Sequence, residues 1–146
     1  MAGLSSRSAV AMHALAMLAH RRGGSLTSAE IADSLESNPV LVRRVLGLLR
    51  DADLVRSTEG RGGGWTLARA PQDITLHDAY AAVEEGRIFS RHAHPPSRAC
   101  AIGRGIGDVL EAEFQNAERA AAEQLGRTSI AQLLRRILAD PHQERE

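Results

Sequence analysis

Arginine side chains offer the clearest chemistry in this sequence. Arg43, Arg44, Arg50 and Arg61 lie close together in a chain that has no lysine. A guanidinium group is a planar fork of donors that can bind a phosphate, or O6 and N7 of guanine, through two hydrogen bonds. Residues 1–70 hold nine Arg against six Asp and Glu, a balance of +3, whereas residues 71–146 hold nine against twelve, a balance of −3. The N-terminal half is therefore the candidate to bind a polyanion.

A second set of reactive side chains lies in residues 86–101, which hold Cys100, the only cysteine, together with His92 and His94. A single cysteine excludes a disulfide within the chain and is typical of a reducing compartment. Imidazole and thiolate suit zinc, but the spacing H-x-H-x5-C matches no closed zinc pattern. An iron–sulfur cluster takes about four protein ligands. We therefore expect no metal site, no cluster and no other cofactor.

Two predicted short helices position the first three arginines. Thr27 and Glu30 have the spacing of a capping box that starts one helix. Ser37 or Asn38 can cap the next helix, with Pro39 at its first turn, where a missing N–H costs nothing. This helix is expected to run to about residue 52, with a core stripe made of Leu41, Val45, Leu48 and Leu49.

A predicted hairpin follows, with short β-type runs over 54–58 and 65–67. The loop between them, Glu59-Gly60-Arg61-Gly62-Gly63-Gly64, favours the left-handed backbone that glycine adopts. Asp53 lies in the turn before the first strand, and aspartate tolerates a left-handed conformation better than most residues do. Two short helices and a glycine-tipped hairpin are the plan of a winged helix-turn-helix, which places a helix against DNA.

The remaining residues predict further helices. The first spans 4–22, with Leu4, Ala11, Ala14, Leu15, Leu18 and Ala19 on its core face, and ends at Gly23-Gly24. A capping box of Thr75 and Asp78 starts a fourth helix, which ends at Glu84. The loop 86–101 leads to a long amphipathic helix over 102–125, about 36 Å in length. A last helix over 129–138 directs Ile130, Leu133, Leu134 and Ile137 to the core, and the tail from Pro141 is polar.

These patterns predict a mainly α-helical fold with a small β wing. We expect a winged helix-turn-helix DNA-binding domain over 1–85, a sensor or linker loop over 86–101 and dimerisation helices over 102–140. The long helix is too long for so small a domain to cover, so its expected partner is the same helix of a second subunit. No apolar run approaches the length of a membrane span and the N-terminus lacks a secretory pattern, so we expect a cytoplasmic protein with no membrane partner.

The segment LVRSTEGRGGGWTLAR, preceded by NPVLVRRVLGLLRDA, resembles the Rrf-two family of winged-helix transcription regulators. The resemblance extends to AVAMHALAMLAH, ITLHDAYAAVE, CAIGRGIGDVLEAEF and TSIAQLLRR. Within the family, the NPV-VRR and HPP---C-IGR patterns are most similar to the cluster-free, YwnA-like members. The resemblance implies a homodimer with crossed long helices, whose third helices enter the major grooves of an inverted-repeat operator in double-stranded DNA while the wings lie beside minor grooves.

Carried onto this sequence, the resemblance places base contacts on Asn38, Val40 and Arg43 and phosphate contacts on Arg44, Arg50 and Ser57. Glu59 stands where the cluster-binding members have a minor-groove arginine, and Arg61 is expected to replace it because narrow minor grooves attract arginine. The alternative is that Arg43 and Arg44 form a solvated helix face. Three further positions, Ser28, Pro39 and Gly62, complete the predicted DNA-binding set.

The predicted function is sequence-specific transcription regulation, with repression by operator occupancy the simplest mode. The alternative is a winged-helix adaptor that binds proteins and not DNA. No nucleophile–base pair, paired carboxylates or phosphate-binding loop suggests an enzyme.

Three hypotheses concern the signal that the protein senses. Cys100 could be a thiol switch for an oxidant, since a helix N-terminus and Arg98 would both lower its pKa, or an inert small side chain. A small-molecule effector could instead bind between the fourth helix and the long helix, near Trp65, Tyr80, Phe89 and the histidines. Those aromatic side chains are equally explained as core.

Overall fold

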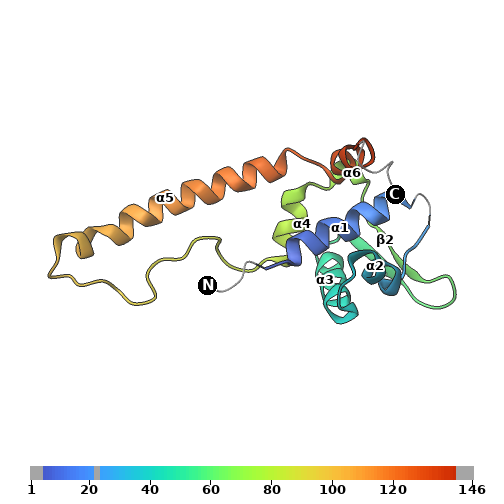
Figure 1. Cartoon of the computed structure of the whole chain (residues 1–146), viewed down its shortest axis with the longest axis horizontal. Coiled ribbons are helices and arrows are strands. Elements are labelled where there is room, and N and C mark those ends of the chain that lie inside the picture. Colours follow the sequence, from blue (N-terminus) through green and yellow to red (C-terminus); the bar gives the residue numbers. More distant parts are fainter. Residues whose placement is uncertain (1–4, 22–23, 141–146) are drawn as a thin grey trace.

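The computed structural model describes residues 5–21 and 24–140 and confirms a mainly helical fold with a small antiparallel sheet. In Figure 1 most elements gather at one end of the molecule, and the long helix α5 extends from it as an arm. The predicted roles of Leu4, Gly23 and the tail from Pro141 concern residues outside those ranges. The elements are α1 (Arg7–His20), α2 (Ser28–Leu35), α3 (Pro39–Asp51), β1 (Val55–Thr58), β2 (Gly64–Leu67), the 3-10 helix η1 (Pro71–Asp73), α4 (Leu76–Val83), α5 (Ala101–Gly126) and α6 (Ile130–Leu138).

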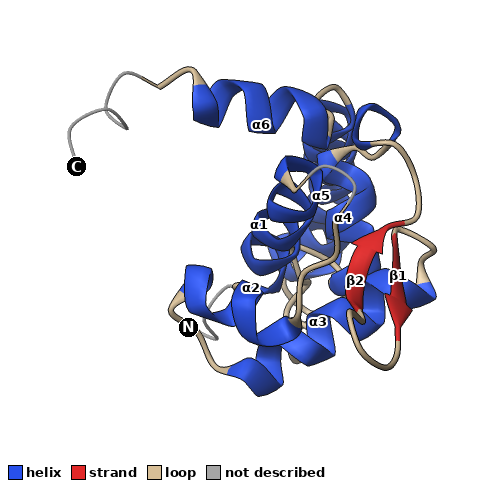
Figure 2. Cartoon of the chain, turned by 90° about the vertical axis from the view of Figure 1, so that its right-hand side faces the viewer, coloured by secondary structure: helices blue, strands red, loops and turns tan. Residues whose placement is uncertain are grey.

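Helix α1 is the centre of the core. It packs against α2, α3, α4, α6 and β2, and Figure 2 shows it between the α2–α3 pair and α6. Ala11, Ala14 and Leu15 are fully buried, as predicted. The small side chains let neighbouring helices approach α1 closely. The surrounding helices and strand β2 are therefore built around one short, tightly packed helix.

The C-terminal helix α6 packs against α1 and η1, and its Ile130 is fully buried in the core of the winged-helix elements. Leu133 packs against the same core. The prediction that Leu134 and Ile137 pack there was wrong, because the later turns of α6 extend beyond the elements that cover Ile130, and Leu134 lines a surface cleft instead. Ile137 is 39% exposed.

In α3 the predicted core stripe was right at Val45 and Leu49 and wrong at Leu41 and Leu48, which Val42 and Leu46 replace. Val42, Val45, Leu46 and Leu49 are the buried side chains, at the i, i+3, i+4, i+7 spacing of one helix face. Leu41 and Leu48 lie at the edges of that face and are only partly buried.

The capping boxes and left-handed turns explain where these elements begin and end. Thr27 with Glu30, and Thr75 with Asp78, form both reciprocal hydrogen bonds of a capping box, as predicted. Asp53 has φ 60°, which confirms the expected left-handed turn after α3. Glu36, at φ 49°, ends α2 in the same conformation, which the sequence did not predict.

The wing is an antiparallel pair, β1 and β2, that is held to the core by a third segment. Trp65 and Leu26 exchange two backbone hydrogen bonds of 2.7 and 3.1 Å. A Cβ atom on Gly64 would lie 2.7 Å from the Leu26 carbonyl oxygen, so only glycine fits this crossing. At the tip, the Gly63 N–H donates to the Gly60 carbonyl, and Gly62 has φ 74°. The wing is therefore fixed at its base and projects only its tip.

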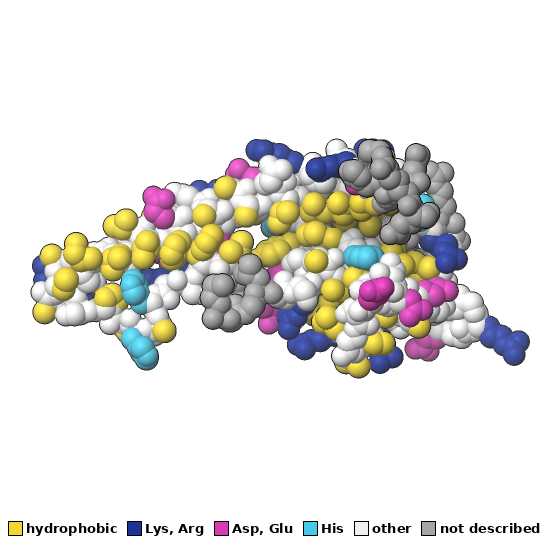
Figure 3. Space-filling model, in the orientation of Figure 1, with side chains coloured by type: hydrophobic (Ala, Val, Ile, Leu, Met, Phe, Trp, Pro, Cys, Tyr) yellow, Lys and Arg dark blue, Asp and Glu magenta, His cyan; other side chains and the backbone are white. Residues whose placement is uncertain are grey.

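The arm consists of α5 and the preceding loop. None of the α5 residues is buried, and Ile102 and Val109 are 70% and 65% exposed. Figure 3 shows a row of hydrophobic side chains along this arm. Among the described residues, no helix combines the length and the apolar character that a membrane span requires.

The loop between α4 and α5 is fastened to the arm. Arg87 Nη1 donates to both carboxylate oxygens of Glu111 at 2.7 and 2.9 Å, and this hydrogen bonding lowers the pKa of Glu111. The ring of Phe89 stacks on Phe114 at 5.2 Å, and the Phe89 N–H donates to Glu118. The loop thus runs back along its own helix as an ordered strap.

Candidate nucleic-acid interface

The N-terminus of α3 is open to solvent and well ordered by its cap. The Asn38 Oδ1 atom accepts a 2.8 Å hydrogen bond from the Val40 N–H, and Pro39 occupies the first turn. All three residues are exposed, and Val40 is 63% exposed. A branched apolar side chain held in water at a helix start is suited to contact a thymine methyl group. The helix start also carries the positive end of the helix dipole, which favours phosphate.

Arg43 and Arg44 lie on the solvent face of α3, opposite its core stripe. With Val40 they follow the i, i+3, i+4 spacing of one helix face. Both arginines are exposed, and neither has an ion-pair partner among the described residues. Their guanidinium groups are therefore available to an external anion.

Arg50 has a second role that the sequence did not indicate. Its guanidinium carbon lies 5.9 Å from the centre of the Trp65 ring, and its Nε atom lies 3.7 Å from Asp51. The contact joins the end of α3 to β2 through a cation–π interaction. The side chain is 53% exposed, so one face of the guanidinium group remains open to a phosphate.

The wing carries the remaining predicted residues. Arg61 and Gly62 form the exposed centre of the tip, and Ser57 is exposed on β1. The Ser25 hydroxyl donates a 3.2 Å hydrogen bond to the Gly62 carbonyl, which steadies the tip. The sequence analysis did not select Arg56, an exposed basic residue on β1. A basic side chain within a predicted strand of the wing was the feature that indicated it.

Ser28 opens α2, the first helix of the helix-turn-helix, and is half-buried. In this motif the first helix crosses the DNA backbone while the second enters the groove. Ser28 lies at the start of α2, at the opposite end of that helix from the turn that leads to α3.

Cys100 is exposed immediately before α5. The backbone N–H groups of Gly103 and Ile102 stabilise its thiolate and lower its pKa. The expected direction is confirmed, but Arg98, the second expected cause, is not among the groups responsible. His92 and His94 are also exposed, and the described residues contain no cluster of three or more ligand side chains placed to hold a metal ion.

The suggested effector site is not assembled as the sequence indicated. Trp65 belongs to the wing, and Phe89 stacks on the arm. Only Tyr80 lines a cavity between α4 and α5, of about 190 Å³, where it is joined by His77 and Glu118. The cause is the loop between α4 and α5, which runs outward along α5 (Figure 1).

Comparison with known proteins places these features in one family. Residues 4–136 match the Rrf2 family model, described as an iron-dependent transcriptional regulator. The HTH-type transcriptional regulator YwnA of Bacillus subtilis (strain 168) is 35% identical over 136 residues, which cover 92% of this chain and 98% of YwnA.

Solved structures agree with the fold. A transcriptional regulator from Lactobacillus plantarum superposes with a TM-score of 0.79 at 27% identity, over 93% of this chain and 92% of that one. IscR of T. potens superposes with a TM-score of 0.71 at 23% identity, over 92% and 88% of the two chains. The match over most of the chain, with the winged helix-turn-helix and the long helix, shows that this protein belongs to the Rrf2 family of DNA-binding transcriptional regulators and is not an enzyme.

Proposed function

We propose that this protein is a homodimeric, cytoplasmic repressor that binds an inverted-repeat operator, with α3 in the major groove and the wing tip beside the minor groove. One observation carries the proposal. The capped start of α3 presents Val40, Arg43 and Arg44 on a single exposed face, while Arg61 projects from a wing that is fixed at its base. Base readout falls on Asn38, Val40 and Arg43, and Arg44, Arg50 and Ser57 contact phosphates.

The dimer is supported by the arm. A helix of 26 residues without a fully buried side chain leaves apolar residues such as Ile102 and Val109 exposed to water, which is unfavourable for a folded chain. Pairing with the same helix of a second subunit would cover them. A two-fold dimer then reads half-sites about 34 to 36 Å apart, or multiples of that distance.

We propose further that the protein works without an iron–sulfur cluster, although the family model is described as iron-dependent. A cluster takes about four protein ligands, and the sequence holds one cysteine. The residues present do not fit such a group. Cys100 is instead proposed as a thiol switch, because it is exposed and its pKa is lowered by the start of α5.

The test uses the full-length protein and the DNA upstream of its own gene, with affinity measured by fluorescence anisotropy over a series of salt concentrations. The Arg43→Ala variant is expected to lose about 1 to 3 kcal/mol of operator affinity and to relax specificity at one base pair. Arg44→Ala is the matched control on the same helix. It is expected to weaken operator and unrelated DNA alike and to reduce the salt slope by about 1.

Unchanged operator affinity in a folded Arg43→Ala protein would remove the assignment of base readout. Absence of any salt-dependent DNA binding would favour the protein-binding adaptor. For the switch, oxidation is expected to change operator affinity in the wild type and not in Cys100→Ser. An equal change in both would show that the thiol is not the sensor.

A further inference from the structure

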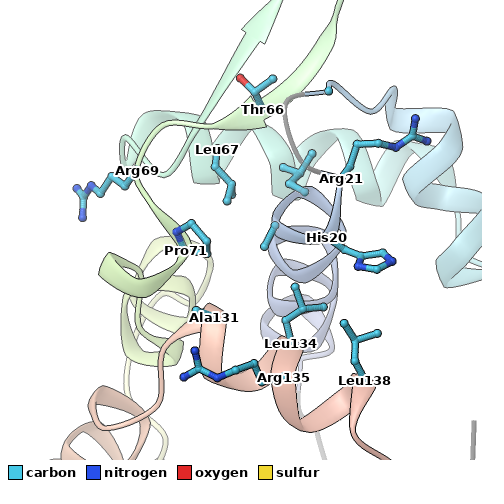
Figure 4. A pocket seen from close by; sticks show the side chains of 13 residues that line it. His20, Arg21, Thr66, Leu67, Arg69, Pro71, Ala131, Leu134, Arg135 and Leu138 are labelled. Atoms are coloured by element: carbon cyan, nitrogen blue, oxygen red, sulfur yellow. The ribbon is translucent and has the colours of Figure 1, made fainter.

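A cleft of about 690 Å³ lies on the side of the winged-helix elements where α1 ends, between β2, η1 and α6. Figure 4 shows Leu67 pointing into it from the end of β2, and Leu134 and Leu138 pointing toward it from α6. Leu138 is 53% exposed at its edge. The volume is within the range of small-molecule sites, about 300 to 1,000 Å³.

The charges around this cleft are all of one sign. Arg21, Arg69 and Arg135 line it, and no carboxylate is among the lining residues that the structure describes. None of the three arginines has an ion-pair partner within the described residues. In Figure 4 the guanidinium groups of Arg21 and Arg69 turn outward on opposite sides of the rim. An apolar centre with an unpaired cationic rim is complementary to an amphipathic anion.

Helix-end electrostatics explain only part of this pattern. Basic side chains are common in the last turn of a helix because they interact with its negative end, and His20 and Arg135 stand in the last turns of α1 and α6. Arg69 follows β2 and has no such reason to be there. Arg136 shares the last turn of α6 with Arg135 but does not line the cleft. A substitution of Arg136 therefore distinguishes an effect of the helix end from an effect of the cleft.

We propose that the cleft binds a small monocarboxylate with an aliphatic body, whose carboxylate meets Arg135 at the rim and whose chain lies against Leu67, Leu134 and Leu138. The site joins the end of β2 to α6, so a bound molecule contacts the wing and the helix that follows the arm. Occupancy is therefore expected to change operator affinity, and this part of the inference rests on the proposed function. By linkage, operator DNA must change the affinity for the carboxylate by the same factor.

Calorimetry with decanoate, below its micelle concentration, tests the site on the full-length protein. Decyltrimethylammonium has the same chain and the opposite charge, and it is expected not to bind. Arg135→Gln is expected to weaken decanoate binding about tenfold, the loss of one charge-assisted hydrogen bond, whereas Arg136→Gln leaves it unchanged. At a decanoate concentration that saturates the wild type but not the Arg135→Gln variant, decanoate is expected to shift the dissociation constant of the operator complex by a larger factor in the wild type.

Several results would overturn the inference. If decyltrimethylammonium binds as tightly as decanoate, the arginine rim does not select the anion. If Arg135→Gln and Arg136→Gln weaken decanoate binding equally, the weakening is due to the lost charge at the end of α6 and not to the cleft. Binding of decanoate only after removal of residues 141–146 would make that segment the occupant. If decanoate does not bind, or if it binds without changing operator affinity, the effector site is rejected. Operator binding without decanoate is measured separately, so neither result affects the proposed function.

Discussion

Replacing Asn38 by aspartate is expected to separate the folding stability of this protein from its operator affinity. Asn38 Oδ1 accepts a 2.8 Å hydrogen bond from the Val40 N–H and caps α3. Asn38→Asp keeps an acceptor at this position, because aspartate and asparagine are comparable N-caps. It also places a negative charge at the positive end of the helix dipole, which stabilises the helix by about 0.3 to 1 kcal/mol. Asn38→Ala, the comparison variant, removes the acceptor.

The effect on stability follows from the cap. Asn38→Ala is expected to cost about 1 kcal/mol of unfolding free energy, or about 3 °C in melting temperature at fixed protein concentration. Asn38→Asp is expected to melt at or slightly above the temperature of the wild type. The exposed position of Asn38 leaves no packing term to complicate the comparison.

The Asn38→Asp substitution is expected to lower operator affinity, although it does not lower stability. A carboxylate about 6 Å from a phosphate in a water-like dielectric is repelled by about 0.7 kcal/mol. With two phosphates within reach of the helix start, the cost is about 1.4 kcal/mol, a tenfold loss of operator affinity. The loss should grow at low salt, where screening is weaker.

Two measurements check this reasoning: thermal unfolding followed by circular dichroism and operator binding followed by fluorescence anisotropy at several salt concentrations. If Asn38→Asp melts as early as Asn38→Ala, the cap is not what stabilises α3. If Asn38→Asp binds the operator as tightly as the wild type, the start of α3 does not face phosphates, and the proposed docking of this helix is wrong.

The remaining predictions concern the wing, the thiol and the arm. Gly64→Ala brings a Cβ atom within 2.7 Å of the Leu26 carbonyl and is expected to cost about 1 to 3 kcal/mol of stability, measured by urea unfolding; full stability would show that the crossing adapts. The lowered pKa of Cys100 predicts that alkylation by iodoacetamide reaches half its maximal rate at a lower pH in the folded protein than in urea, and coincident pH profiles would contradict this. Val109→Asp, at a 65% exposed apolar position of α5, is expected to shift dimer to monomer in sedimentation, while an unchanged mass would place the interface elsewhere.

Features that depend on local chemistry could be predicted from the sequence. The capping boxes at Thr27 and Thr75, the cap at Asn38 and the glycine turn of the wing each involve residues close together in the chain. Their hydrogen bonds form within one turn, so spacing alone identifies them. The same holds for the exposed face of α3 that carries Arg43 and Arg44.

Features that depend on packing between distant segments could not be predicted. In α3 both Leu41 and Val42 are apolar, and the contacts with α1, α2 and α4 decide that Val42 is buried. The pairing of Arg50 with Trp65, and the stacking of Phe89 on Phe114, likewise join residues that no local period relates. Glu36 adopts a left-handed conformation that its residue type does not indicate, because the turn between α2 and α3 requires it.

The unburied arm has a mechanical consequence. Helix α5 is 26 residues long, so it is a rod of about 39 Å, and the strap through Arg87 and Phe89 adds to its stiffness. A rod of that length acts as a lever, and a rotation of about 5° at its α4 end displaces the far end by about 3.4 Å. That distance is the rise of about one base pair along a DNA strand. In the proposed dimer, in which the two arms pair, a small change of angle between the arm and the winged-helix elements would therefore shift the recognition helices relative to their half-sites.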